Sequence, residues 1–167
     1  DLSSARRSYV EPDNAADVVS RDFTDAATGF SAKVTTTEES VVAALKNDGT
    51  KLVVDNSASG DAYKNAQNIL APLYNGELEF DFYDARLVDV SGNQVKLAGN
   101  TKVEIKLPTS KSDICDVALL QNGSAKTLFE NEKATGGAFS VVREKLGTFA
   151  VVDKTKASKW TSKTLVN

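Results

Sequence analysis

Histidine and methionine are both absent from this chain of 167 residues, which contains one cysteine and one tryptophan. Without an imidazole, the chain cannot form the usual serine or cysteine protease triads, nor most zinc and copper sites. Its single cysteine, Cys115, cannot form an internal disulfide, and we expect it to be a small buried side chain on a strand. Enzymatic chemistry would therefore have to depend on carboxylates, lysine or tyrosine. Because no initiator methionine is present, we expect Asp1 to be a cut point inside a larger polypeptide.

The sequence also has no basic stripe, because its 20 Lys and Arg residues are interspersed among 23 Asp and Glu residues. A nucleic-acid groove needs clustered positive charge, so we expect no nucleic-acid partner. No apolar run is long enough to span a bilayer and no signal-like segment opens the chain, so we expect no membrane insertion. A hydrophobic content of 41% with 26% charged residues is typical of a globular domain.

Alternation of apolar and polar residues predicts a mainly β fold. The expected strands are residues 30–35, 51–55, 78–87, 103–107, 113–121, 124–129, 138–143 and 148–153. Within the third of these, the apolar residues change face after Phe82, which predicts a bulge or a strand crossing between sheets. Pro108 cannot donate to a ladder and should end its strand.

Two short helices are expected between the strands. Thr36 and Glu39 match a capping box before the apolar face of Val41, Val42 and Leu45, and Gly49 offers a C-terminal stop. The second helix should run from Asp61, as its cap, to about Leu70, because Pro72 disfavours helix at the residue before it.

Glycine-containing turns separate the strands at residues 92–93, 99–100, 122–123 and 136–137. Short strands at this regular spacing predict an antiparallel β-sandwich of the Ig-like, Greek-key type. We expect residues 1–21 to be a lead-in or linker and residues 22–153 to be the sandwich module. Residues 154–167 would be a C-terminal linker or the beginning of the next module.

Five segments in order carry a resemblance: DAATGFSAKV, KLVVD, YDARLVDVSGNQVKLAGNTKVEIKLP, DVALLQNGSAKTL and GGAFSVVREKLGTFAVVD. They resemble a recurrent β-sandwich accessory module of Gram-positive multidomain cell-surface proteins and secreted glycoside hydrolases. The resemblance covers about residues 22–153 and implies an extracellular or cell-wall-attached accessory role. It supplies no catalytic residues. The chain departs from the family pattern at Lys145-Leu146-Gly147, where the family tends to have histidine-phenylalanine-serine, and at Phe149, which replaces a tyrosine.

Two groups of residues with side-chain oxygens are candidates for chemistry. Paired carboxylates can hydrolyse glycosides, and Glu77, Glu79 and Asp81 project from one strand face, but this pattern is also that of a solvated strand side. Asp89, Ser91 and Asn93 resemble the start of a calcium loop. An EF-hand would require a glutamate at the twelfth position, which is Asn100, so a hairpin turn is the better interpretation. We therefore expect no catalytic residue, metal or cofactor.

Trp160 is the one residue singled out for interaction. It could provide a stacking platform for a sugar, dock the next module or anchor an edge strand, and we favour docking or packing. The four tyrosines are scattered and should be structural: Tyr9, Tyr63, Tyr74 and Tyr83.

By analogy with some Gram-positive surface sandwiches, an intramolecular Lys–Asn bond is a further hypothesis. It needs a buried, neutral amine, whereas Lys33 and Lys102 fall on the polar sides of their strands. The sequence singles out no pair.

These observations favour a non-catalytic extracellular module that acts as a spacer or interaction domain and contacts neighbouring modules of the same polypeptide. The alternative is a carbohydrate-binding or adhesin module that recognises host glycans or proteins. A carboxylate enzyme using Glu79 or Asp81 is a distant third hypothesis.

Overall fold

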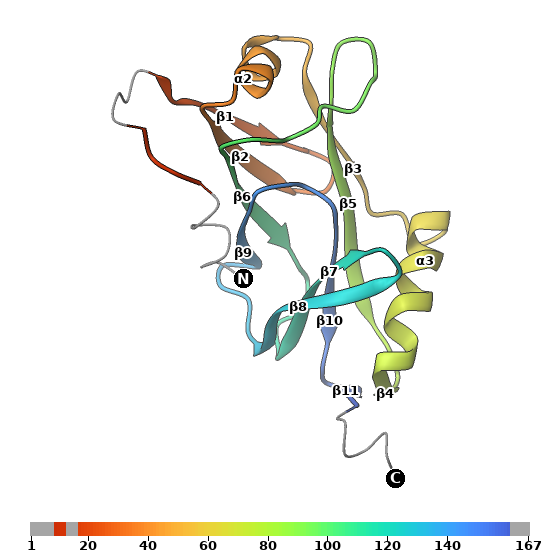
Figure 1. Cartoon of the computed structure of the whole chain (residues 1–167). Coiled ribbons are helices and arrows are strands. Elements are labelled where there is room, and N and C mark those ends of the chain that lie inside the picture. The colour runs from red at the N-terminus through yellow and green to blue at the C-terminus, as the bar shows by residue number, and fades with distance from the viewer. Residues whose placement is uncertain (1–8, 13–16, 161–167) are drawn as a thin grey trace. The chain divides into compact units, whose positions relative to one another are not determined.

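The structure is a computed structural model that describes residues 9–12 and 17–160 (Figure 1). The chain divides into two compact units, each assembled from segments that are distant in the sequence. Unit 1 is drawn from Asp1–Val54, Ala85–Pro108 and Phe139–Leu146. Unit 2 is drawn from Asp55–Asp84, Thr109–Ala138 and Gly147–Asn167.

Unit 1 is built on a four-stranded sheet. Its strands, in spatial order, are β1 (Val19–Thr24), β2 (Ser31–Thr36), β6 (Thr101–Pro108) and β9 (Ala138–Arg143). The pairings of β1 with β2 and of β2 with β6 are antiparallel. Along β6, every second residue is buried, as the alternation predicts, and Pro108 ends the strand.

Helix α2 (Glu39–Lys46) packs in unit 1 through the buried side chains of Val41 and Leu45. Arg21 on β1 fixes the end of this helix, because its guanidinium donates hydrogen bonds to the carbonyls of Leu45 at 3.0 Å and Asn47 at 2.8 Å. The last carbonyls of a helix have no partner within the helix, so an arginine there supplies donors and a favourable charge.

The capping box predicted for α2 is wrong. Glu38 is the N-cap and makes no side-chain cap bond. Thr36 instead belongs to β2, where its hydroxyl lies 2.8 Å from that of Thr101 and accepts from the Glu38 amide. The helix also ends earlier than predicted, at Lys46 with Asn47 as C-cap, so Gly49 does not stop it.

Unit 2 contains most of a five-stranded sheet. The spatial order is β3 (Lys51–Asp55), β5 (Phe80–Val88), β10 (Thr148–Asp153), β7 (Cys115–Gln121) and β8 (Ser124–Glu132). The pairings of β5 with β10, β10 with β7 and β7 with β8 are antiparallel. Asn122 and Gly123 both have positive φ in the two-residue turn before β8, as a type I′ hairpin requires.

Helix α3 (Asp61–Leu70) covers part of this sheet and is followed by the 3-10 turn η2 (Ala71–Leu73). Its bounds are those predicted, although Gly60 rather than Asp61 is the N-cap. Ala66 and Leu70 pack in one buried cluster with Ala118, Leu120, Ala150 and Val152. The ring of Tyr63 stacks on Phe80 with 5.0 Å between centroids, which confirms a structural role for this tyrosine.

Phe82 and Tyr83 are adjacent and both buried, so both faces of β5 are covered there. The pairing of β5 with β10 keeps its register from Phe80 to Asp84, so the predicted bulge is not found in that pairing, and β5 stays in one sheet. The chain passes from unit 2 to unit 1 just after Tyr83, between Asp84 and Ala85. The turn around Gly92 and Asn93 forms as expected. The segment after it makes only a single bridge, between Val88 and Gln94, so no second hairpin strand follows.

Three strands lie where the sequence predicted none: β1, β4 (Tyr74–Gly76) and β11 (Ala157–Lys159). β1 begins at Val19, inside the expected lead-in, and β11 lies inside the expected C-terminal linker. β11 pairs antiparallel with β4. These additions extend the antiparallel pattern, and the expected mainly β, antiparallel fold class with two short α-helices is confirmed.

Gly76 should be required for the pairing of β4 with β11. It has φ +101, and a Cβ there would collide with the backbone carbonyl of Lys156. Gly76→Ala should lower the free energy of unfolding by about 2–4 kcal/mol, from backbone strain and overpacking together. Gly60→Ala is the matched control, because a Cβ at Gly60 meets nothing within 4 Å. Urea unfolding of both variants measures the difference, and equal stabilities would contradict this account of β11.

Candidate functional site

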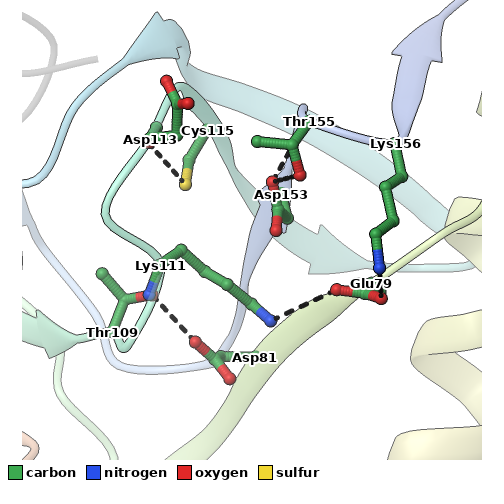
Figure 2. A network of polar contacts seen from close by, with 9 residues as sticks. All are labelled: Glu79, Asp81, Thr109, Lys111, Asp113, Cys115, Asp153, Thr155 and Lys156. Carbon is green, nitrogen blue, oxygen red and sulfur yellow. Dashed lines mark hydrogen bonds and ion pairs between the residues drawn. The ribbon is translucent and has the colours of Figure 1, made fainter.

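The acidic residues that could carry chemistry are held by partners within unit 2. Figure 2 shows Glu79 between two lysines, with 3.2 Å to Nζ of Lys156 and 3.9 Å to Nζ of Lys111. Asp81 on β5 accepts a hydrogen bond of 2.8 Å from the hydroxyl of Thr109. Glu77 is exposed. The carboxylates of Glu79 and Asp81 therefore hold the segments that flank β5, an arrangement that fits a scaffold role.

Asp153, at the end of β10, belongs to the same network (Figure 2). Burial alone raises the pKa of its carboxyl. Hydrogen bonds from the amide and hydroxyl of Thr155, at 2.8 and 2.7 Å, and the charges of Lys111 and Lys156 outweigh that effect, so the pKa lies below its ordinary value.

Cys115 is fully buried at the start of β7, which confirms the prediction for it. Burial, followed by the negative charges of Asp153 and Asp81, raises the pKa of its thiol to about 11. Since the thiolate is the reactive form, this cysteine is suited to packing rather than to nucleophilic attack.

The loop that resembles a calcium site is a turn closed by Asp89. Its Oδ1 accepts hydrogen bonds from the amides of Ser91 at 2.9 Å and Asn93 at 3.0 Å. This side-chain turn explains why turn-forming residues are concentrated here. Across residues 9–12 and 17–160, no group of three or more Cys, Asp or Glu side chains could hold a metal ion.

Trp160 immediately follows β11 and is half-buried. Its amide donates a hydrogen bond of 2.9 Å to the carbonyl of Leu73, which extends the pairing between β11 and β4. The backbone of Trp160 is thus anchored within unit 2, and its role in an interaction stays a prediction.

One hollow combines aromatic and polar side chains. It has a volume of about 120 Å³ and is lined by Asn56, Ala58, Tyr63 and residues 80–83. Ligand pockets usually enclose roughly 300–1,000 Å³. This hollow is therefore too small to enclose a drug-sized ligand, although an aromatic ring beside it could contact one.

A buried polar cluster was not identified from the sequence. Asp116 on β7 is 1% exposed and receives hydrogen bonds from the hydroxyl of Tyr74 at 2.7 Å, the amide of Asn131 at 3.0 Å and the amine of Lys154 at 3.0 Å. Burial and then the bond to Asp116 raise the pKa of Tyr74 well above its ordinary value. The available signal was an aspartate inside the apolar run CDVALL, because a buried charge must be paired.

The lysines considered from the sequence lie elsewhere. Lys33 is exposed, and the amine of Lys102 lies 5.2 Å from the ring centroid of Tyr9. Tyr9 is itself buried in unit 1, so at least this residue of the expected lead-in packs on the fold.

Comparison with protein-family models, curated proteins and solved structures finds no match to this chain. In the part of the chain that the structure describes, no helix is long and apolar enough to cross a membrane.

The Tyr74 hydroxyl should contribute measurably to stability. Tyr74→Phe removes a hydrogen bond to a buried carboxylate, and such bonds contribute roughly 1.5–3 kcal/mol. We expect a loss of about 2 kcal/mol in the free energy of unfolding. Tyr63→Phe keeps the ring stack on Phe80 and serves as control, with a change within about 0.5 kcal/mol. Equal losses in the two variants would contradict a specific role for the bond to Asp116.

Asp153 should make stability dependent on acid pH. Because its folded pKa is lowered, its contribution is present above the unfolded pKa of about 3.9 and is lost as the pH falls through the folded value. Asp153→Asn should therefore destabilise the chain most near neutral pH, and the difference from wild type should shrink below about pH 4. Urea unfolding across this range measures it, and a difference that does not change with pH would contradict the account.

Proposed function

We propose that this chain is a non-catalytic extracellular β-sandwich module that acts as a spacer or interaction domain in a bacterial surface protein or secreted glycosidase. One observation carries the proposal: the acidic side chains that could supply chemistry form ion pairs and hydrogen bonds that hold chain segments in place. Glu79 pairs with two lysines, Asp81 accepts from Thr109, and Asp89 closes its own turn.

The resemblance of residues 22–153 to surface modules supports the extracellular setting. The stretch that carries most of that resemblance is consistent with a scaffold, because it contains the Asp89 turn and the alternating strand β6. The partners we propose are neighbouring modules of the same polypeptide.

A second candidate, glycan binding, has one observation in its favour. The hollow beside Tyr63 and Phe80 also presents Asn56 and Asp81, and sugars are bound by aromatic faces next to polar groups. The stacking of Tyr63 on Phe80 already occupies one face of each ring, which favours the spacer over this alternative.

The test combines a glycoside-hydrolysis panel with a glycan array. The proposal predicts no turnover by the wild-type chain and no glycan signal that depends on the hollow. Turnover that is lost in Glu79→Gln or Asp81→Asn and kept in the exposed control Glu77→Gln would establish an enzyme instead. Binding to one glycan class that is abolished by Tyr63→Ala would establish the carbohydrate-binding alternative.

A further inference from the structure

A lysine amine, an asparagine carboxamide and a buried carboxylate meet at one end of the sheet in unit 2. Lys154 directly follows β10, and its Nζ lies 2.8 Å from Oδ1 of Asn131 on β8. The same Nζ lies 3.1 and 3.0 Å from Oδ1 and Oδ2 of Asp116 on β7. In the sheet, β7 runs between β10 and β8. Asp116 on β7 therefore lies between Lys154, which follows β10, and Asn131 on β8.

These three side chains are held in place by their surroundings. The Lys154 side chain is 10% exposed and that of Asp116 is 2% exposed, so water has little access to the ion pair. The backbone amide of Lys154 donates to the carbonyl of Ile114, and that of Asn131 donates to Asp116 itself. Asn131 has φ +56, a conformation that asparagine tolerates better than most residues.

Such positioning is what an amide-forming reaction needs. A reaction between groups held in contact has a much smaller entropic barrier than the same reaction between free groups. A neighbouring base makes an amine nucleophilic by taking its proton, and Asp116 is in contact with the amine. Asn131 is itself exposed, which gives a released ammonia a route to solvent.

We propose that Lys154 and Asn131 form an intramolecular isopeptide bond, with Asp116 as the acid–base group. Asp116 takes a proton from the Lys154 ammonium, and Nζ then attacks the carboxamide carbon of Asn131. The new bond joins Nζ to that carbon, and the bond from the carbon to Nδ2 breaks. One of the Nζ protons goes through Asp116 to the departing nitrogen, and another stays on Asp116. The Lys154 ammonium, the Asp116 carboxylate and the Asn131 carboxamide thus give a secondary amide, a neutral carboxylic acid at Asp116 and one ammonia, without an oxidant or reductant.

The other lysines that make polar contacts in unit 2 lack this combination. Lys111 and Lys156 pair with Glu79, which is 36% exposed, and Lys159 contacts the hydroxyl of Thr127. None of these contacts brings an amine to a carboxamide beside a buried acid. The proposed bond would tie the end of β8 to the residue after β10, across β7.

Intact mass of the purified full-length chain is the direct test. The bond predicts a mass lower than that calculated from the sequence by one ammonia, about 17 Da. Lys154→Arg keeps a cation beside Asp116 but removes the nucleophile, so it should have its calculated mass. Lys156→Arg is the matched control and should keep the deficit. A wild-type chain at its calculated mass, or one that has lost water through an amide to Asp116, overturns the proposal.

A tryptic map locates the bond without depending on the folding of any variant. Lys154 in an amide resists trypsin, so residues 127–133 and 146–156 should appear as one linked species. Recovery of the two as separate peptides, with cleavage after Lys154, would overturn the assignment. The linked chain should also melt roughly 10 °C above Lys154→Arg, because the cross-link restricts the unfolded chain.

Discussion

The buried carboxylate of Asp116 is the interaction on which unit 2 depends. Tyr74 at the start of β4, Asn131 near the end of β8 and Lys154 after β10 all donate to it. Asp116 is 1% exposed, and in the unlinked chain its carboxylate is stable because its oxygens are hydrogen-bonded and its charge is paired with Lys154. Removing one partner of such a pair typically costs about 3–5 kcal/mol. Asp116 therefore fixes the positions of the three segments that contain Tyr74, Asn131 and Lys154. Apolar packing alone would allow these segments to shift along the sheet.

Carboxylates also hold chain segments near the surface of unit 2, where each contact contributes less to stability. Glu79 forms ion pairs with Lys111 and Lys156, and Asp153 accepts a hydrogen bond from the hydroxyl of Thr155. The chain after β10 is therefore held at successive positions before it pairs with β4 as β11. Exposed ion pairs of this kind contribute only about 0–1 kcal/mol each. In unit 1, Arg21 has a comparable role, because its guanidinium donates hydrogen bonds to the carbonyls at the end of α2. Charge in this protein thus holds chain segments in register, which supports the proposed role as a spacer.

Much of the fold was predictable because local patterns agree with tertiary structure. β9, β10 and α3 have the predicted bounds, and the turn at Asn122 and Gly123 forms a hairpin as its sequence indicates. β11 was missed because three residues carry no detectable alternation and the strand exists only through its pairing with β4. The Asp116 cluster was missed for a similar reason: its members are separated by up to 80 positions and share no motif. Only the acid inside an apolar run indicated that a partner was needed, and the sequence does not say which partner.

Amide hydrogen exchange at Asn131 tests the organising role of Asp116 most directly. The residue is exposed and lies near the end of an edge strand, where amides ordinarily exchange through local fraying. If the carboxylate holds this segment, the Asn131 amide should exchange only with the unfolding of unit 2, as slowly as the amides inside β7. Exchange as fast as that of Gly123 in the neighbouring turn would show that Asp116 does not hold the end of β8, and would contradict the account.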